Sequence, residues 1–472
     1  MKRKTAVCSA AGAGIMMAFA MSFTALAATG WQQEGDDWRF YLNNGDIATD
    51  TWKKSGSQWF YLGEDGLMVK SRLVEDGDDY YYVNSTGARV LSQWRKLPNE
   101  DPEDDEPDEV WYYFQANGKA YKASASGKTS FKSIVTASGA VKKYTFDDEG
   151  HMLFGWVNEE SQRVTGEEAW KEGVYYCGGE DDGAMVSGEW RELDVTDEEN
   201  EDSSFNDQYW FYFQTNGKKA ANTKKTINGR KYLFLENGNA KYEWYAATLS
   251  DGILATPENT FYSSPDQCWM AAGWFRAVPS EDIDPQAYED DEPYWFYGLK
   301  SGGVVTSQIK TINGQPYGFN EHGMMLYGLY KMKVEGKKIL SYEKIESESD
   351  FPEAGEEEAV YYFGDKPKEG VMETGKCSIT LDGEKYTYYF KTSGSDKGAG
   401  AEGIYDGSVY EKGRLLTIED GMRYGVVEYD GKEYLVSQSG KIQKGKKNVK
   451  DSDGTYYASD KEGIVIHRGD KQ

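Results

Sequence analysis

The residues of this chain best suited to bind a ligand are tryptophans and tyrosines that recur at a fixed interval near the N-terminus. An aromatic ring face attracts a quaternary ammonium ion through its quadrupole, and aromatic side chains also line sugar-binding sites. The same rings equally suit the core between packed elements, and the sequence leaves that alternative open. The two columns, each with an interval of 21 residues, are Trp31, Trp52, Leu73 and Trp94, and Trp38, Trp59 and Tyr80.

Glycines that share this interval indicate the elements that must position the rings. In residues 51–70, Trp52 opens a short strand and Gly56 lies in a turn. A strand-favouring return segment at residues 59–62 then leads into a second turn at Gly66. One hairpin is marginally stable in water, whereas stacked hairpins bury each other's aromatic faces. We therefore expect an all-β fold: a solenoid of stacked β-hairpins with enlarged acidic loops and a divergent C-terminal third.

Farther along the chain the hairpin pattern continues with acidic insertions. Residues 95–110, 191–209 and 275–294 are such insertions, and we interpret them as exposed, enlarged hairpin loops. Each is preceded by a leading tryptophan and ends near a second one; the pairs are Trp94 and Trp111, Trp190 and Trp210, and Trp274 and Trp295. The expected organisation is a signal peptide at 1–27, regular repeats at 28–94, larger repeats at 95–330, and divergent hairpins or a small β domain at 331–472.

The first residues have the pattern of an export signal. Lys2, Arg3 and Lys4 precede an uncharged apolar stretch from about residue 6 to residue 26, and residues 25–27 (Ala-Leu-Ala) fit a cleavage site. A retained membrane anchor is the alternative, because the stretch is nearly long enough to span a bilayer. We expect cleavage, secretion and non-covalent association with the cell surface, with no membrane span in the mature chain.

Charge and chemistry restrict the function further. The net charge of −27 argues against nucleic acid, whose binding depends on clustered basic residues. Cys177, Cys268 and Cys377 are too few for a disulfide framework, so one bridge or none is expected. His151 and His322 adjoin turn glycines and suit turns better than a metal site. No familiar catalytic motif occurs, so we expect a protein that is not an enzyme and has no metal or cofactor.

The segment Gly30-Trp31, Gly35, Trp38, Tyr41-Leu42 and Gly45 resembles the cell-wall-binding repeat of Gram-positive surface proteins. The best-known members are choline-binding modules, and related repeats occur in glucan-binding regions of glucosyltransferases and in clostridial toxins. The resemblance implies that neighbouring hairpins pair two tryptophans and a tyrosine, often with a methionine, into a cage for choline on teichoic acid. Leu73 and Tyr80 depart from that pattern, which disfavours a cage in the third repeat.

The expected partner is therefore a cell-wall polymer, either choline-decorated teichoic acid or a glycan, bound through several weak sites at once. The alternative is a structural or adhesive surface protein that recognises a protein partner through its acidic loops. The candidate ligand-binding aromatics are Trp31, Trp38, Tyr41, Trp52, Trp59, Tyr61, Trp94, Trp111, Tyr113, Trp190, Trp210, Trp274 and Trp295.

Overall fold

The computed structural model describes residues 29–100, 102, 106–195, 208–246, 260–281, 283–353, 357–364 and 369–471. The predicted signal peptide lies outside these residues, as do most of the second acidic insertion and part of the first. Contacts divide the chain into two compact units. Of the described residues, unit 1 contains 29–190, 194–195 and 213–219, and unit 2 contains 191–193, 208–212 and the chain from residue 220 onward. No helix among the described residues is long and apolar enough to cross a membrane.

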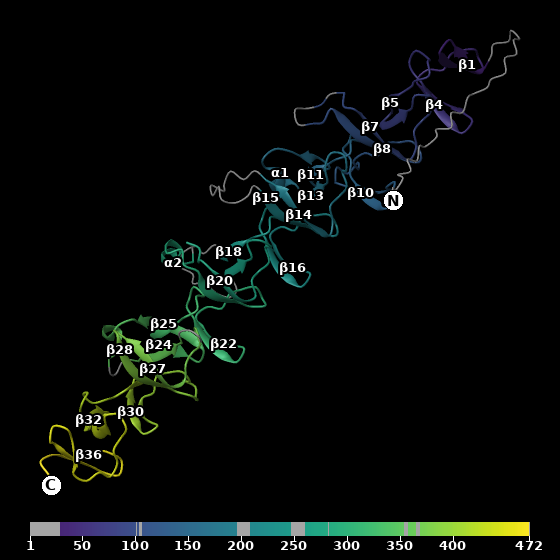
Figure 1. The fold of residues 1–472 in the computed structure, drawn as a ribbon. Coiled ribbons are helices and arrows are strands. Elements are labelled where there is room, and N and C mark those ends of the chain that lie inside the picture. The colour runs from purple at the N-terminus through teal and green to yellow at the C-terminus, as the bar shows by residue number, and fades with distance from the viewer. Residues whose placement is uncertain are drawn as a thin grey trace, which may run out of the picture. The chain divides into compact units, whose positions relative to one another are not determined.

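Unit 1 is a succession of short antiparallel hairpins (Figure 1). Its elements are β1 (Gly30–Glu34), β2 (Asp37–Tyr41), β3 (Thr51–Ser55), β4 (Gln58–Leu62), β5 (Arg72–Asp76), β6 (Asp79–Val83), β7 (Gln93–Pro98), β8 (Glu109–Phe114), β9 (Lys132–Val135), β10 (Val141–Tyr144), β11 (Gly155–Val157), β12 (Arg163–Val164), α1 (Ala169–Glu172) and β13 (Tyr175–Cys177). The hairpin of β14 (Glu189–Asp194) and β15 (Gln208–Phe213) is divided between the units.

Unit 2 begins with hairpins of the same kind and then contains wider sheets. Its elements are β16 (Thr223–Ile227), β17 (Arg230–Phe234), β18 (Glu243–Ala246), β19 (Thr260–Ser263), β20 (Gly273–Ala277), α2 (Pro285–Glu289), β21 (Tyr294–Gly298), β22 (Gln308–Ile312), β23 (Gln315–Phe319), β24 (Gly328–Glu335), β25 (Lys338–Ile345), η1 (Glu348–Asp350), β26 (Ala359–Phe363), β27 (Gly375–Leu381), β28 (Glu384–Phe390), β29 (Gly403–Tyr405), β30 (Ser408–Glu411), β31 (Arg414–Leu415), β32 (Tyr424–Tyr429), β33 (Lys432–Ser437), β34 (Val449–Lys450), β35 (Tyr456–Ser459) and β36 (Val465–Gly469).

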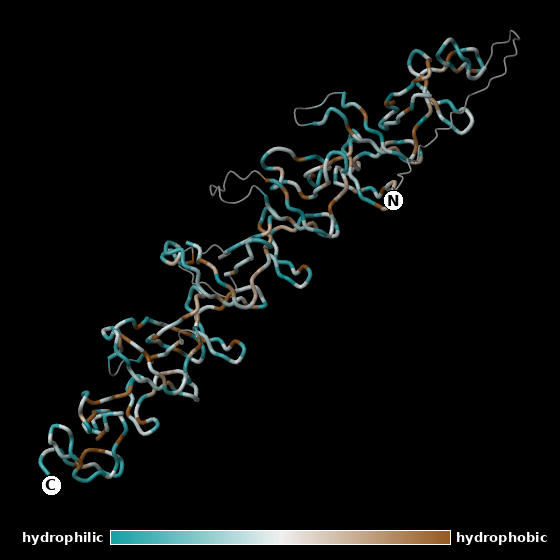
Figure 2. The backbone as a smooth tube through the Cα atoms, viewed as in Figure 1, coloured by the Kyte–Doolittle hydropathy of each residue, from teal (hydrophilic) through white to brown (hydrophobic). Residues whose placement is uncertain are grey.

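These elements confirm the predicted all-β fold of hairpins. The 21-residue register places Trp31, Trp52, Leu73 and Trp94 at the second position of β1, β3, β5 and β7. Figure 2 shows short hydrophilic and hydrophobic stretches alternating along the backbone. Side chains alternate along a strand, so a short return strand with several aromatics presents rings to both neighbours.

One backbone hydrogen bond joins most hairpins to the one before. The N–H group two residues after a turn glycine donates to a carbonyl at the start of the preceding return strand. In unit 1, the N–H of Met68 donates to the carbonyl of Trp38 and the N–H of Arg89 to that of Trp59, both at 2.9 Å. In unit 2, Met325 donates to Trp295 at 2.8 Å. The side chain at this position in each hairpin is therefore held against its predecessor.

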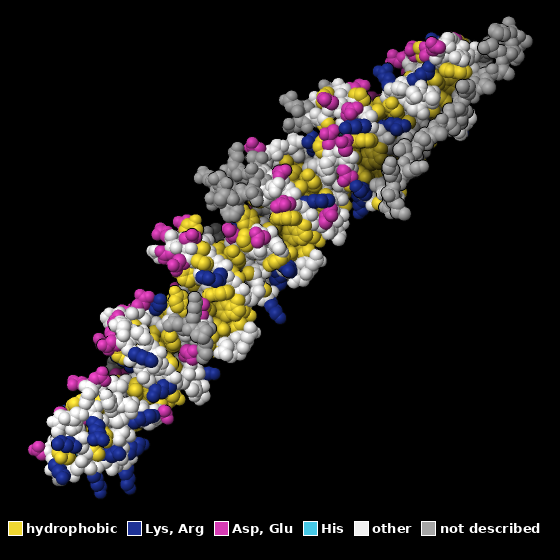
Figure 3. Space-filling view, viewed as in Figure 1, with side chains coloured by type: hydrophobic (Ala, Val, Ile, Leu, Met, Phe, Trp, Pro, Cys, Tyr) yellow, Lys and Arg dark blue, Asp and Glu magenta, His cyan; other side chains and the backbone are white. Residues whose placement is uncertain are grey.

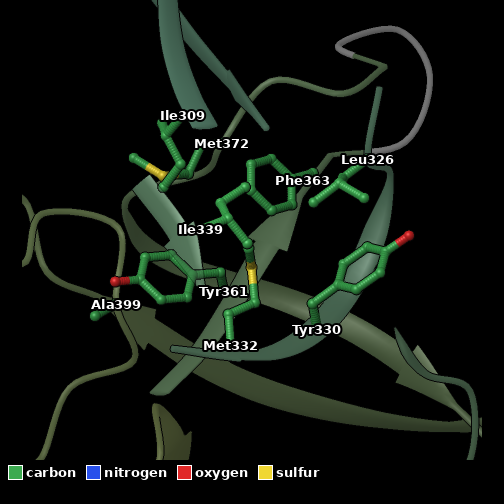
Figure 4. Packing of buried hydrophobic residues seen from close by; sticks show 9 residues of the cluster. All are labelled: Ile309, Leu326, Tyr330, Met332, Ile339, Tyr361, Phe363, Met372 and Ala399. Atoms are coloured by element: carbon green, nitrogen blue, oxygen red, sulfur yellow. The ribbon is translucent and has the colours of Figure 1, made fainter. Parts of the chain in front are cut away.

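The last third of the chain contains two five-stranded sheets, ordered β23-β22-β25-β24-β26 and β27-β28-β31-β30-β29. The long β24–β25 hairpin joins strands that would otherwise form separate pairs. Tyr330, Met332 and Phe363 of the first sheet pack in one buried cluster with Ile339 and Met372 (Figure 4). These sheets are still built from hairpins, and whether residues 331–472 act as a separate domain stays a prediction.

Residues 278–293 form the predicted enlarged connection of the β20–β21 hairpin, but this connection is not exposed throughout. This segment contains α2, whose N-terminus is capped by Asp284, and Ile283 and Ala287 are each only 5% exposed. They pack in one cluster with Trp244 and Phe296. Ile283 precedes the N-cap and Ala287 lies within α2, so the two buried side chains are isolated apolar residues in an acidic segment and show no helical periodicity in the sequence.

Candidate aromatic ligand-binding sites

In unit 1, two consecutive hairpins bring two tryptophans, a tyrosine and a methionine together. Trp94 on β7 and Trp111 on β8 are on paired strands, and Tyr144 ends β10 in the next hairpin. Met152 follows that hairpin, and its N–H donates to the carbonyl of Trp111 at 2.8 Å. All four belong to one apolar cluster, which we call the Trp94 cluster.

The rings of the Trp94 cluster meet edge to face. The Trp94 and Trp111 centroids are 6.3 Å apart with an interplanar angle of 87°, and those of Trp94 and Tyr144 are 4.8 Å apart at 67°. Tyr144 and Met152 are buried, 5% and 6% exposed, whereas both tryptophans are partly accessible. The cluster therefore has a buried floor and tryptophan walls that solvent reaches.

A carboxylate fixes the outer tryptophan wall. The indole N–H of Trp111 donates to Asp181 at 3.1 Å, and the Lys96 ammonium lies 3.0 Å from the same oxygen. These two donors hold the pKa of the Asp181 carboxyl below its usual range. Among the described residues, no lysine or arginine lies over the rings of Trp94, Trp111 or Tyr144. The Trp111 ring is thus held in one orientation, and the charged group nearest to it is the Asp181 carboxylate.

The same arrangement recurs in unit 2 as the Trp274 cluster, formed by Trp274 on β20, Trp295 on β21, Tyr317 on β23 and Met325. The two tryptophan centroids are 6.1 Å apart at 86°. Those of Trp274 and Tyr317 are 4.7 Å apart at 71°. Arg276 lies beside this cluster, with its guanidinium 5.6 Å from the Trp295 centroid and bonded to the carbonyl of Pro293. Figure 3 shows hydrophobic side chains gathered in patches on the visible face of both units.

The predicted pair Trp52 and Trp59 also lies with a tyrosine of the next hairpin, but a cation of the chain is among the rings. The Arg89 guanidinium is 5.1 Å from the Trp52 centroid, 5.5 Å from that of Trp59 and 5.6 Å from that of Tyr81. We call these four residues the Trp52 cluster. Arg89 holds the place that Met152 and Met325 hold elsewhere, because its N–H donates to Trp59 as theirs do to Trp111 and Trp295.

The other candidates are distributed among several settings. Trp31 packs edge-on against Phe60 of the next hairpin, with centroids 5.5 Å apart, and Met68 is bonded to Trp38. Tyr41 donates its hydroxyl to Glu34 within its own hairpin. The remaining four behave as follows: Tyr61 and Tyr113 pack on the leading tryptophans Trp52 and Trp94, and Trp190 and Trp210 lie on β14 and β15.

Sequence reasoning missed Tyr144, Met152, Tyr317, Met325 and Arg89. Three of them, Arg89, Met152 and Met325, have a positional signal in the sequence, because each lies two residues after a turn glycine. The two tyrosines lie eight residues before the corresponding methionines, but in hairpins without a leading tryptophan. Among the described residues no group of three or more acidic, histidine or cysteine side chains could hold a metal ion.

The repeated hairpins and their tryptophan clusters are similar to those of cell-wall-binding repeats. Residues 48–94 match the choline-binding repeat family, and residues 29–45 and 108–120 match the family described as a putative cell wall binding repeat. The resemblance predicted from the sequence is thereby confirmed for these N-terminal repeats. The Trp94 cluster begins within the matched residues and is completed beyond them.

Two curated relatives are glucosyltransferases. Glucosyltransferase-I of Streptococcus downei is 23% identical over 362 residues, which cover 75% of this chain and 20% of that protein. Glucosyltransferase-S of Streptococcus mutans is 26% identical over 272 residues, which cover 55% of this chain and 14% of that protein. The chain thus spans about a fifth or less of these relatives.

Solved structures of similar fold include choline binding protein F from Streptococcus pneumoniae, with 20% identity and a TM-score of 0.37. The match covers 71% of this chain and 99% of that one. The modular autolysin LytC of the same species gives 17% identity and a TM-score of 0.34, covering 65% of this chain and 55% of that one.

Proposed function

We propose that this protein is a secreted binding protein that attaches non-covalently to a choline-bearing polymer of the Gram-positive cell wall. The observation that carries the proposal is the recurrence of two tryptophans, a tyrosine and a methionine, with nearly the same ring geometry, in the Trp94 and Trp274 clusters. Trp31 and Trp38 remain predicted ligand contacts, and the proposal rests first on these two complete clusters.

The chemistry of both clusters suits a quaternary ammonium group. Such an ion has no N–H to donate, so it is recognised by ring faces, each contributing about 0.5–2 kcal/mol. The perpendicular tryptophans offer faces in two directions, and the adjacent thioether of the methionine is polarisable. Near the Trp94 cluster, the carboxylates of Glu180 and Asp181 add a negative field that attracts cations.

Weak individual sites become useful on a polymer. A chain with sites in both units can engage several choline groups of one teichoic acid, and the second contact is then intramolecular. Attachment of this kind needs no covalent link and is reversed by free choline at high concentration.

The proposal is tested by calorimetric titration of the protein with choline and by retention on purified choline-bearing walls, with glucan oligosaccharide as the comparison ligand. We expect heat from choline, elution from walls by choline, and loss of one site each in Trp111→Leu and Trp295→Leu. Tyr288→Ala is the control, because that ring is 50% exposed on α2 and outside both clusters. If the protein binds glucan oligosaccharide but not choline, the ligand is a neutral sugar. Binding of neither would refute the proposal.

A further inference from the structure

In the Trp52 cluster the chain supplies its own cation. Three ring centroids lie between 5.1 and 5.6 Å from the Arg89 guanidinium, within the range of a cation–π contact. The rings correspond one by one to those of the two complete clusters: Trp52 to Trp94, Trp59 to Trp111, and Tyr81 to Tyr144. The difference lies in the fourth residue, an arginine in place of a methionine. In the Trp274 cluster Arg276, which belongs to strand β20, lies over one ring, that of Trp295, whereas Arg89 lies over all three rings of the Trp52 cluster.

Arg89 is fixed in this position from the other side by the next turn. A Cβ built on Gly118 would come 2.7 Å from Arg89 Nε, so the arginine stem is covered by that glycine. The Nε atom is buried and has no hydrogen-bond partner among the described residues. Burial also lowers the pKa of the guanidinium, although an arginine stays charged at neutral pH. The aromatic faces are therefore the main interaction of a partly desolvated cation.

A second hairpin joint in unit 1 has the same substitution. Lys219 lies two residues after the turn glycine Gly217, and its N–H donates to the carbonyl of Val174. The Lys219 ammonium is 5.4 Å from the ring centroid of Trp156, the leading tryptophan of the preceding hairpin. It also donates to the carbonyls of Trp170 and Lys171 at 2.6 and 2.8 Å. Arg89 and Lys219, which both lie two residues after a turn glycine, therefore each place a cation over the leading tryptophan of the preceding hairpin.

We propose that Arg89 closes the Trp52 cluster to external ligands, because its guanidinium occupies the ring faces that a quaternary ammonium group takes in the Trp94 and Trp274 clusters. Arg89 is then a specificity-determining residue that decides which hairpin joints bind the polymer. An incoming cation meets both a filled site and a like charge. The inference rests on the proposed function for the identity of the ligand, but not for the closure itself.

Replacing Arg89 by the methionine of the other clusters tests this directly. Arg89→Met is expected to bind one choline more than the unaltered protein, with an affinity within about tenfold of the other sites, since the same ring types are exposed. Arg89→Lys keeps the charge and is expected to gain no site. Arg72→Met is the matched control, because it removes one exposed positive charge from the neighbouring strand β5.

A second measurement keeps the inference testable if Arg89→Met does not fold. In the otherwise unaltered protein, Trp52→Leu should leave the number of choline sites unchanged, whereas Trp111→Leu should remove one. Loss of a site in Trp52→Leu, or an unchanged number in a folded Arg89→Met, overturns the closure. If the unaltered protein binds no choline and Arg89→Met binds one, the proposed function fails and the closure stands. If neither binds, both fail.

Discussion

Met152 lies against Gly183 of the following hairpin, where a Cβ on the glycine would come within 2.4 Å of the Met152 Sδ and Cε atoms. The turn at Gly183 therefore supports Met152, the floor of the Trp94 cluster, and leaves no room there for a side chain larger than that of glycine. The same relationship recurs in unit 2 between Met325 and Gly370, again at 2.4 Å from Sδ. A residue far from the rings in sequence therefore controls where the floor of the site lies.

Gly183→Ala is expected to destabilise the protein and to weaken choline binding at the Trp94 cluster. The glycine has a φ of +57°, and its added methyl group would overlap Met152. Backbone strain of about 1–2 kcal/mol and overpacking of about 1–3 kcal/mol should add. The control is Gly139→Ala, where φ is +85° but nothing lies within 4 Å. Urea unfolding measures both variants, and equal losses would show that the contact with Met152 is unimportant.

His151 should make stability depend on pH. Burial lowers its pKa, but the hydrogen bond to Asp147 and the charges of Asp147 and Glu149 outweigh burial and raise the pKa above 6.5. A group with a raised folded-state pKa stabilises the fold fully below its unfolded value and loses that contribution as pH rises through the folded value. The ring Nδ1 is 3.2 Å from Asp147, and Nε2 is 2.8 Å from the Tyr112 hydroxyl.

The measurement for His151 is thermal unfolding of the protein and of His151→Gln at several pH values. The difference in free energy of unfolding between them should be largest at about pH 5.5 and shrink at about pH 9, as the imidazolium deprotonates. Comparing the two proteins at each pH cancels the titration of the many other carboxylates. A difference that grows with pH would contradict the raised pKa.

Asp181→Ala is expected to reduce choline affinity at the Trp94 cluster about two- to fivefold, the effect of an exposed ion pair and one hydrogen bond. The carboxylate orients Trp111 and is itself 72% exposed, so stability should change little. The Trp274 cluster serves as an internal reference. Glu167→Ala, which removes another exposed carboxylate from unit 1, should have no effect on either site.

The three described cysteines are free thiols, which answers the question left open by their number. Burial raises the pKa of Cys177 and Cys377 to about 12 and that of Cys268 to about 11. The thiolate is the reactive form, so alkylation of all three at about pH 8 should be slow in the folded protein and fast in denaturant. Mass spectrometry follows the labelling, and rapid labelling of Cys177 under native conditions would contradict its burial.

The hairpins were predictable because their signals are local. A tryptophan, leucine or tyrosine at the second strand position and a glycine in each turn predict β1 to β7 within one repeat of the sequence. The binding clusters were not predictable in full, because each is completed by the next hairpin. Tyr144 is 33 residues beyond Trp111, on a strand with no tryptophan. The position of Arg89, two residues after Gly87, is visible in the sequence, but the three rings around its guanidinium are not, because they come from two hairpins.

The five-stranded sheets of unit 2 could not be predicted from local sequence patterns, for a different reason. The first sheet forms because the β24–β25 hairpin lies between strands that resemble an ordinary repeat, and β25 pairs with β22 through a single register position. The second forms because β31 pairs with both β28 and β30. Pairing between hairpins depends on which edges meet, and the composition of one hairpin does not specify that.

The recurring joint hydrogen bond, such as Met68 to Trp38 and Met325 to Trp295, has a consequence for the history of the gene. Each joint uses backbone atoms at the same two positions and a glycine that admits the neighbouring side chain. We therefore expect that unequal recombination which adds or deletes one whole hairpin leaves the same backbone hydrogen bond available at the new junction.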